Sequence, residues 1–374
     1  KPEFAGAVEA AASTGGQIMP PIMGAAAFLM AEYIGIPYGE VALKAILPAF
    51  LYFAGIFIAV HLEAKKLGLK GISRSEMVPG KALLKKSYLL IPIVLLVVLV
   101  SLNVYTMQKA AALSIIAAII VGVINKDSRL TPAKFLEALE AGGKGTITVA
   151  VACCMAGIIA GCITVTGLAS ILINAIVQLA GNVTIIGLVL TMLCCIVLGM
   201  GVPTTANYCI MASTCAPILI QLNFPVVAAH FFVFYFGIVA DITPPVALAA
   251  YAGSAIAKSD PMKTGLNATK LAIAAFIVPY IFAYSPALLF ENISGWWEVA
   301  QICVSALLGI FGIAAALNGH LYKKLSWVFR LLLAIGGLGM MIPGTLTDVV
   351  GLALVAAVVA VQYLGAKREK AAIK

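Results

Sequence analysis

Apolar stretches of about 20 residues recur along the chain, and short charged segments separate them. A helix of about 20 apolar residues spans the hydrocarbon core of a bilayer, which is roughly 30 Å thick. Hydrophobic residues make up 63% of the 374 positions and charged residues 10%, whereas soluble domains are about 25% charged. The alternating segments of about 10 residues that are typical of membrane barrels are not found. The sequence therefore predicts an all-α polytopic membrane protein.

The spans are predicted from apolar runs and the residues that interrupt them. A pair of shorter apolar arms, 183–198 and 208–221, is expected to form a re-entrant hairpin. The expected membrane segments lie near 18–34, 41–62, 88–104, 108–124, 147–166, 225–257, 270–289, 297–317, 326–342 and 346–364.

The basic residues favour one orientation in the membrane. If 63–87 is cytoplasmic, alternation of the spans also places 125–146, 258–270, 318–330 and 365–374 inside, and 21 of the 24 Lys and Arg residues then lie in these five segments. Lys and Arg concentrate in cytoplasmic loops. We therefore attribute the net charge of +9 to membrane orientation, expect a cytoplasmic C-terminus, and expect no nucleic-acid partner.

Other features have simpler interpretations. The stretches 128–146 and 168–180 have the spacing of amphipathic helices lying along the membrane interface, the alternatives being a connecting loop and a buried helix. The eight Cys lie in apolar stretches without ligand-type pairing to His, which favours packing roles. The chain begins at Lys1 without a signal peptide, and this start is interpreted as a cut end.

The chain also contains an internal repeat. A shift of 224 residues aligns 16–28 (GQIMPPIMGAAAF) with 240–252 (ADITPPVALAAYA), and the same shift carries Pro37 onto Pro261. In the predicted topology the two copies cross the membrane in opposite directions, as in many secondary transporters that bind substrate near the midplane. Counterparts of the span at 147 and of the hairpin would fall before residue 1, so the chain is expected to be a fragment.

Four parts follow from this repeat. They are the end of a first repeat at 1–62, a basic loop with two spans and an amphipathic connector at 63–146, a second repeat at 147–290, and three additional spans at 291–374.

The Pro pair of the second copy predicts a broken helix. Pro244 and Pro245 remove two amide donors, so a helix cannot pass through them intact, and the carbonyls before them are freed in mid-membrane. Such carbonyls and the Thr243 hydroxyl are oxygen ligands suited to a small cation, while a helix that starts again at the prolines attracts an anion. Asp241 is expected to have a cation-linked or structural role, since an intramembrane acid is costly. The alternative is a proline kink satisfied by neighbouring helices.

The first copy carries a corresponding polar run before its own Pro pair. Gln17 aligns with Asp241, and small polar residues precede it. These small residues suit either a site lined by backbone atoms or close helix packing. The candidate residues of the first copy are Ser13, Thr14, Gly15, Gly16, Gln17, Pro20 and Pro21.

The hairpin tip is the third candidate region. Residues 198–208 (LGMGVPTTANY) interrupt the two apolar arms, which are each short for a span. Glycines permit unusual backbone angles there and Pro203 stops the first arm. A polar outer loop between two ordinary spans is the alternative interpretation. The candidate residues at the tip are Gly199, Gly201, Thr204, Thr205 and Asn207.

Four isolated polar residues are weaker candidates for lining a path: Glu9, Glu32, His230 and Tyr235. No phosphate loop, metal-ligand cluster or nucleophile elbow is recognisable, so an enzyme is not expected.

These motifs resemble the large membrane subunit of TRAP (tripartite ATP-independent periplasmic) transporters, and most closely the fused permeases of the TAXI-associated branch. The stretches that carry the resemblance are 9–32, 199–208 and 241–253, and it covers roughly 1–290. It implies an elevator-type importer in the bacterial inner membrane that is driven by Na⁺. It also implies an organic acid substrate of the carboxylate or C4-dicarboxylate class, a periplasmic substrate-binding protein and a small membrane subunit.

The resemblance further implies cation sites at the hairpin tip and the broken helix. The positions that match are Gly199, Gly201, Thr204, Thr205, Asn207, Gly237, Thr243 and Pro244, of which Gly199, Thr204, Asn207, Gly237 and Thr243 are the sodium candidates. No other cofactor is expected. A cation/dicarboxylate symporter that works without a binding protein is the main alternative, and a channel or scaffold is a further one.

Overall fold

The computed structural model describes the chain except for residues 22, 70, 72–78, 102–104, 126–128, 182, 343 and 373–374. Parts of the predicted inner segments 63–87, 125–146 and 365–374 fall outside the described residues, and these include Lys70, Arg74, Lys126 and Lys374.

Helices account for all regular structure in the described ranges, apart from one isolated bridge between His320 and Lys324. The α-helices are α1 (Pro2–Gly15), α2 (Ala25–Ile34), α3 (Tyr38–Leu67), α4 (Gly80–Lys85), α5 (Ile91–Ser101), α6 (Met107–Ile124), α7 (Pro132–Val165), α8 (Leu168–Ala180), α9 (Thr184–Gly199), α10 (Thr204–Thr214), α11 (Ala216–Gln221), α12 (Val226–Val239), α13 (Leu248–Ala257), α14 (Pro261–Leu271), α15 (Ile273–Tyr284), α16 (Trp296–Asn318), α17 (Trp327–Gly339) and α18 (Thr345–Ala372). Three 3-10 helices are η1 (Ser87–Leu90), η2 (Ala240–Ile242) and η3 (Pro286–Leu289).

Four helices in the described residues are long and apolar enough to cross a membrane by length and composition. They are Tyr38–Leu67, Pro261–Tyr284, Trp296–Asn318 and Thr345–Arg368. A fifth is counted if Cys153–Val165 and Leu168–Ala180, which meet at 69°, form one broken span. Of the shorter apolar helices, Gln108–Ile124 has the bounds of the predicted span 108–124, whereas Trp327–Gly339 is shorter than the predicted span 326–342. The predicted span 18–34 is wrong as a continuous helix, since α2 begins only at Ala25.

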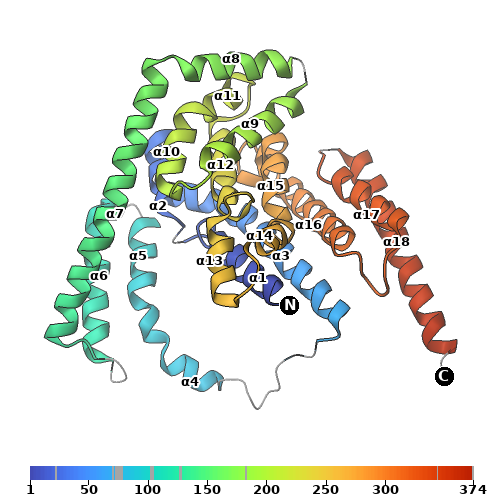
Figure 1. Cartoon of the computed structure of the whole chain (residues 1–374), viewed down its shortest axis with the longest axis horizontal. Coiled ribbons are helices and arrows are strands. Elements are labelled where there is room, and N and C mark those ends of the chain that lie inside the picture. The colour runs from blue at the N-terminus through green and yellow to red at the C-terminus, as the bar shows by residue number, and fades with distance from the viewer. Residues whose placement is uncertain are drawn as a thin grey trace.

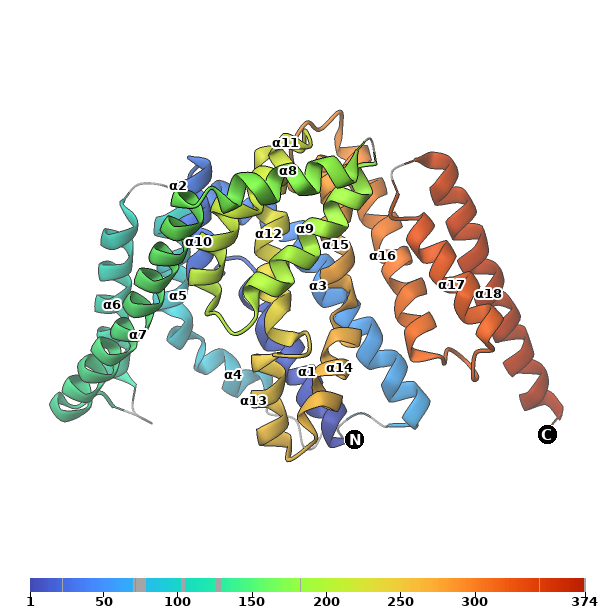
Figure 2. The same cartoon turned by 45° about the horizontal axis from the view of Figure 1, so that its top comes forward.

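The repeat predicted from the sequence has matching helix bounds. Adding 224 to the bounds of α1 gives 226 and 239, which are the bounds of α12. The same shift places α2 within one residue of α13, and Met23 onto Ala247, both of which have positive φ. In Figure 2, α1 runs upward from the lower edge and α12 runs downward from the upper edge. The two broken helices are therefore antiparallel.

The two copies are in direct contact at Gly6 of α1 and Gly253 of α13. A Cβ atom placed on Gly253 would lie 2.7 Å from the carbonyl oxygen of Gly6, and one placed on Gly6 would lie 2.9 Å from that of Gly253. Helix backbones approach this closely only where side chains are absent. Helix α1 also packs along α14.

The predicted separate interface helix at 128–146 is not observed. Pro132–Val165 is one helix of 34 residues, which begins where Thr131 accepts a hydrogen bond from the Lys134 amide. Gly142, Gly143 and Gly145 have a low helical preference, but no proline follows Pro132 in this segment, so the helix continues through them. The predicted helix at 168–180 is present as α8, and Figure 1 shows it crossing the top of the molecule from the end of α7.

The C-terminal helices α16, α17 and α18 form a unit on one side of the molecule (Figure 1). Glycines lie at both of its contacts. A Cβ on Gly309 or on Gly337 would lie 2.7 Å from the carbonyl oxygen of the other residue, and Gly336 meets Gly351 in the same way. The unit is thus held by close backbone packing, which is typical of membrane helices.

A partly buried ion pair joins α3 to the segment that precedes this unit. Lys44 Nζ lies 3.2 Å from Glu291 Oε1, and the Lys44 side chain is 9% exposed. We expect Lys44→Met to lower the free energy of unfolding by about 1–3 kcal/mol, because Glu291 then loses its cation in a partly desolvated place. Thermal unfolding in detergent measures this, with the exposed Lys109 of α6 changed to Met as the control. Equal unfolding temperatures for both variants would contradict the expectation.

Candidate functional site

The tip of the hairpin between α9 and α10 has buried and exposed residues, since Gly199 is buried and Gly201 and Pro203 are exposed. Helix α9 ends at Gly199, Gly201 has a φ of +74°, and Pro203 precedes the first residue of α10. Figure 2 shows both outer ends of this hairpin near α8 and α11, and its tip halfway down the molecule. The chain thus returns to the side from which it came. The second arm begins at Thr204 and not at 208 as predicted, because Pro203 fixes the φ angle that starts a helix.

Three of the predicted cation ligands meet at Asn207. Its side chain is fully buried, and its Nδ2 donates a hydrogen bond of 3.0 Å to the carbonyl oxygen of Gly237. A Cβ on Gly199 would lie 2.6 Å from Asn207 Nδ2, and one on Gly237 would lie 3.3 Å from it. The hairpin tip and α12 therefore contact each other through an amide between two glycines.

One atom of this amide is unsatisfied among the described residues. Asn207 Oδ1 is buried and accepts no hydrogen bond there. Buried polar atoms are nearly always paired, so an orphaned oxygen needs an explanation such as an unseen ion or water. The Asn207 oxygen is therefore the strongest ligand candidate at this junction.

The structure confirms the break after α12, but the next helix does not begin at the prolines as predicted. Helix α13 restarts at Leu248, after the prolines and not at them. The freed carbonyls are partly occupied, since Thr243 Oγ1 donates to Val239 O at 2.7 Å and Thr269 Oγ1 donates to Ile242 O at 3.1 Å. Each carbonyl retains a second lone pair. Sequence reasoning missed Thr269, because nothing in its local pattern shows that α14 passes this break.

The hairpin tip also touches the break. A Cβ on Gly201 would lie 3.6 Å from Val246, and one on Gly199 would lie 2.9 Å from Ala240. Pro244 packs against α14 at Gly265, where an added Cβ would lie 3.1 Å from the proline ring. The half-buried Thr204 and Thr205 lie in the first turn of α10, and Pro245 is exposed.

Asp241 lies in η2 and is half-buried. In the part of the chain that the structure describes, no hydrogen bond or ion pair of its carboxylate is found. The described residues thus supply no partner for this acid.

The first copy has a corresponding break between α1 and α2. Tyr52 Oη donates to Ala11 O at 2.6 Å and Tyr38 Oη donates to Pro21 O at 2.9 Å. A Cβ on Gly15 would collide with the Tyr52 ring. Of the predicted residues, Thr14 and Gly15 are buried, Gln17 and Pro20 are half-buried, and Ser13, Gly16 and Pro21 are exposed.

The weaker candidates differ from each other in their surroundings. His230 Nδ1 lies 2.7 Å from Tyr208 Oη, a partner that sequence reasoning missed although Tyr208 ends the hairpin motif. The Tyr235 hydroxyl is fully buried and has no partner within the described ranges. Glu9 and Glu32 are exposed.

The part of the chain that contains these contacts matches a known protein family. Residues 1–297 match the family described as tripartite ATP-independent periplasmic transporter, DctM component. The chain belongs to the DctM family. The match contains the hairpin and both broken helices and ends at the beginning of α16. No curated protein matches the chain.

Family membership gives the general activity. This DctM protein is a multi-pass membrane component of a TRAP-type secondary transporter and not an enzyme. The family implies a substrate-binding protein and a small membrane subunit as partners. The TAXI-type branch remains a prediction from the sequence.

Proposed function

We propose that this DctM protein imports a small organic acid, of the carboxylate or dicarboxylate class, and that an inward Na⁺ gradient drives the import. The observation that carries the proposal is the junction of Asn207 with Gly237. It offers a buried amide oxygen that has no partner among the described residues, and a backbone carbonyl that already faces the amide. Neutral oxygens of this kind suit Na⁺, a hard cation.

The other sodium candidates lie on the hairpin and the break, which contact each other. Gly199 ends α9, Thr204 begins α10, and Thr243 follows η2. The Thr243 hydroxyl donates to Val239 O, which leaves its own lone pairs for a cation. Bound Na⁺ would supply positive charge at the hairpin tip, and these residues would hold it against the break of α12.

We further propose a bacterial inner-membrane location with a cytoplasmic C-terminus and delivery of substrate by a periplasmic binding protein. The described Lys and Arg of the five predicted inner segments support the orientation. Figure 2 places the ends of α3, α6, α13, α16 and α18 that carry these segments along one edge of the molecule. Such a bias favours the cytoplasmic side.

Uptake into proteoliposomes tests the proposal. The full-length protein is reconstituted with its small subunit, and labelled organic acids are offered with and without an inward Na⁺ gradient and the cognate binding protein. We expect uptake only when both are present. Na⁺-dependent uptake without the binding protein would instead establish an independent symporter, and flux without saturation or gradient dependence would establish a channel.

A further inference from the structure

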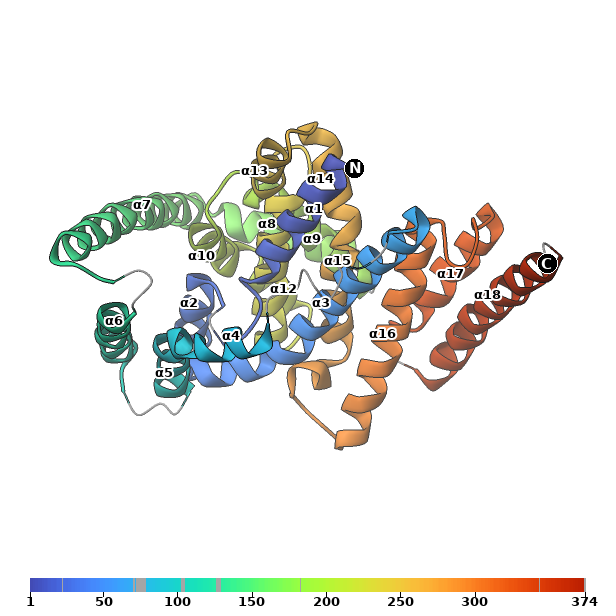
Figure 3. The same cartoon turned by 90° about the horizontal axis from the view of Figure 1, so that it is seen from below.

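A polar cavity of about 280 Å³ is lined by residues of α1, α3, α14 and α16. Figure 3 shows these helices next to one another. The cavity is distant in sequence from the hairpin tip, and α16 lies almost wholly outside the DctM match. The charged residues that line it are Lys1, Glu63, Lys66 and Lys270.

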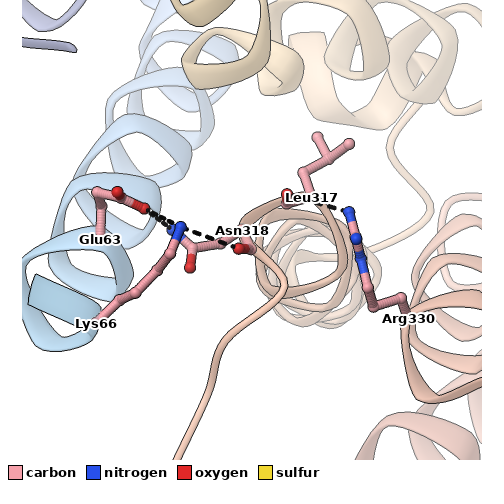
Figure 4. A network of polar contacts seen from close by, with 5 residues as sticks. All are labelled: Glu63, Lys66, Leu317, Asn318 and Arg330. Atoms are coloured by element: carbon pink, nitrogen blue, oxygen red, sulfur yellow. Dashed lines mark hydrogen bonds and ion pairs between the residues drawn. The ribbon is translucent and has the colours of Figure 1, made fainter. Parts of the chain in front are cut away.

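A polar network forms one wall of the cavity. Figure 4 shows Lys66 and Asn318 converging on Glu63, with Lys66 Nζ at 2.9 Å and Asn318 Nδ2 at 2.8 Å from Glu63 Oε2. Arg330 of α17 donates to the carbonyls of Ala316 and Leu317, so the end of α16 is fixed in place. This wall is therefore held by contacts within the chain.

The cavity has an excess of positive charge. Glu63 offsets Lys66, with which it is paired. Lys270 is exposed and has no hydrogen bond or ion pair among the described residues, and Lys1 adds a further ammonium group. An anionic group entering here meets two uncompensated lysines.

The lining of the cavity also narrows the class of anion. Apolar side chains lie beside the charges, namely Phe4, Leu67, Leu271 and Leu317. A ligand with both a phosphate and an apolar part satisfies both environments, whereas a free phosphate ion uses only the charges.

We propose that this cavity binds the headgroup of an anionic phospholipid. Basic pockets between membrane helices bind such headgroups. The phosphate would lie between Lys1 and Lys270. The lipid would join the C-terminal unit to α1 and α14. This inference does not depend on the identity of the transported substrate or of the coupling ion.

Lipid titration of the full chain tests the proposal. Phosphatidylglycerol is added to the protein in phosphatidylcholine nanodiscs, and the apparent dissociation constant is measured. We expect it to rise about fivefold for each lysine removed, and so roughly 25-fold in Lys1→Gln/Lys270→Gln. The matched control is Lys258→Gln/Lys263→Gln, which removes the same charge from exposed positions outside the cavity and should leave the constant unchanged.

Two outcomes would overturn the assignment. Equal weakening in the control would mean that the protein attracts anionic lipid only by its overall charge. Competition by inorganic phosphate as strong as that by phosphatidylglycerol would mean a site for soluble phosphate. If the double variant does not fold, Lys270→Gln alone carries the test, because Lys270 is exposed and supports no described contact.

Discussion

Replacement of Gly253 by Leu is expected to separate α1 from α13 and to abolish transport. The added Cβ meets the Gly6 carbonyl oxygen at 2.7 Å, and a backbone atom inside a helix cannot rotate away as a side chain does. Overpacking of this kind lowers the free energy of unfolding by about 1–3 kcal/mol and sometimes more. We expect a loss near the upper end of this range, because leucine is large and the contact is with backbone. The measurements are the thermal unfolding temperature in detergent and substrate uptake, both of which should fall.

The control for this variant is Gly157→Leu. Gly157 lies inside α7, and no neighbouring atom lies within 4 Å of the position where its Cβ would be. Both changes remove one helical glycine and add the same side chain, so the intrinsic helix preference cancels. If the two variants unfolded at the same temperature, the contact between the two repeats would have no energetic importance.

Replacement of Asn207 by Ala is expected to weaken the Na⁺ dependence of uptake. The half-saturating Na⁺ concentration should rise at least about tenfold, which corresponds to about 1.4 kcal/mol for one lost oxygen ligand. The Gly237 carbonyl also loses its buried donor, so the free energy of unfolding should fall by about 1–3 kcal/mol. Na⁺ titration of uptake measures the first effect and thermal unfolding measures the second.

An exposed amide provides the comparison for Asn207. Asn174 lies on α8 and is exposed, so Asn174→Ala should change neither quantity. A variant of Asn207 that unfolds earlier and keeps the original Na⁺ dependence would show that this side chain is structural only. The cation assignment would then be rejected, while the hairpin geometry would stand.

The elements that could be predicted from the sequence are those set by local chemistry. Pro244 with Pro245 ends a helix wherever it occurs, and Gly199 with Pro203 interrupts one, so both breaks were predictable. The continuity of α7 was not, because charged and apolar residues are equally compatible with a helix and only the span boundary was visible in the pattern.

The contacts of the site depend on packing between distant segments. Asn207 was a candidate because of its polar character, but its bond to the Gly237 carbonyl joins residues 30 positions apart. The Thr269 hydroxyl reaches Ile242 across 27 positions. No periodicity encodes such pairs, since they follow from how α10, α12 and α14 cross.

The C-terminal unit limits how the protein assembles with other membrane subunits. Helix α16 packs along α3, where a Cβ on Gly55 would lie 3.1 Å from Ile310, and any other subunit is sterically excluded from that face. The side chains that α3 leaves exposed include Leu43, Phe50 and Phe57, whose spacing of seven residues places them on one stripe of the helix. In a bilayer this stripe faces acyl chains or a neighbouring subunit. Helix α3 therefore packs against α16 on one face and contacts lipid or another subunit on the other.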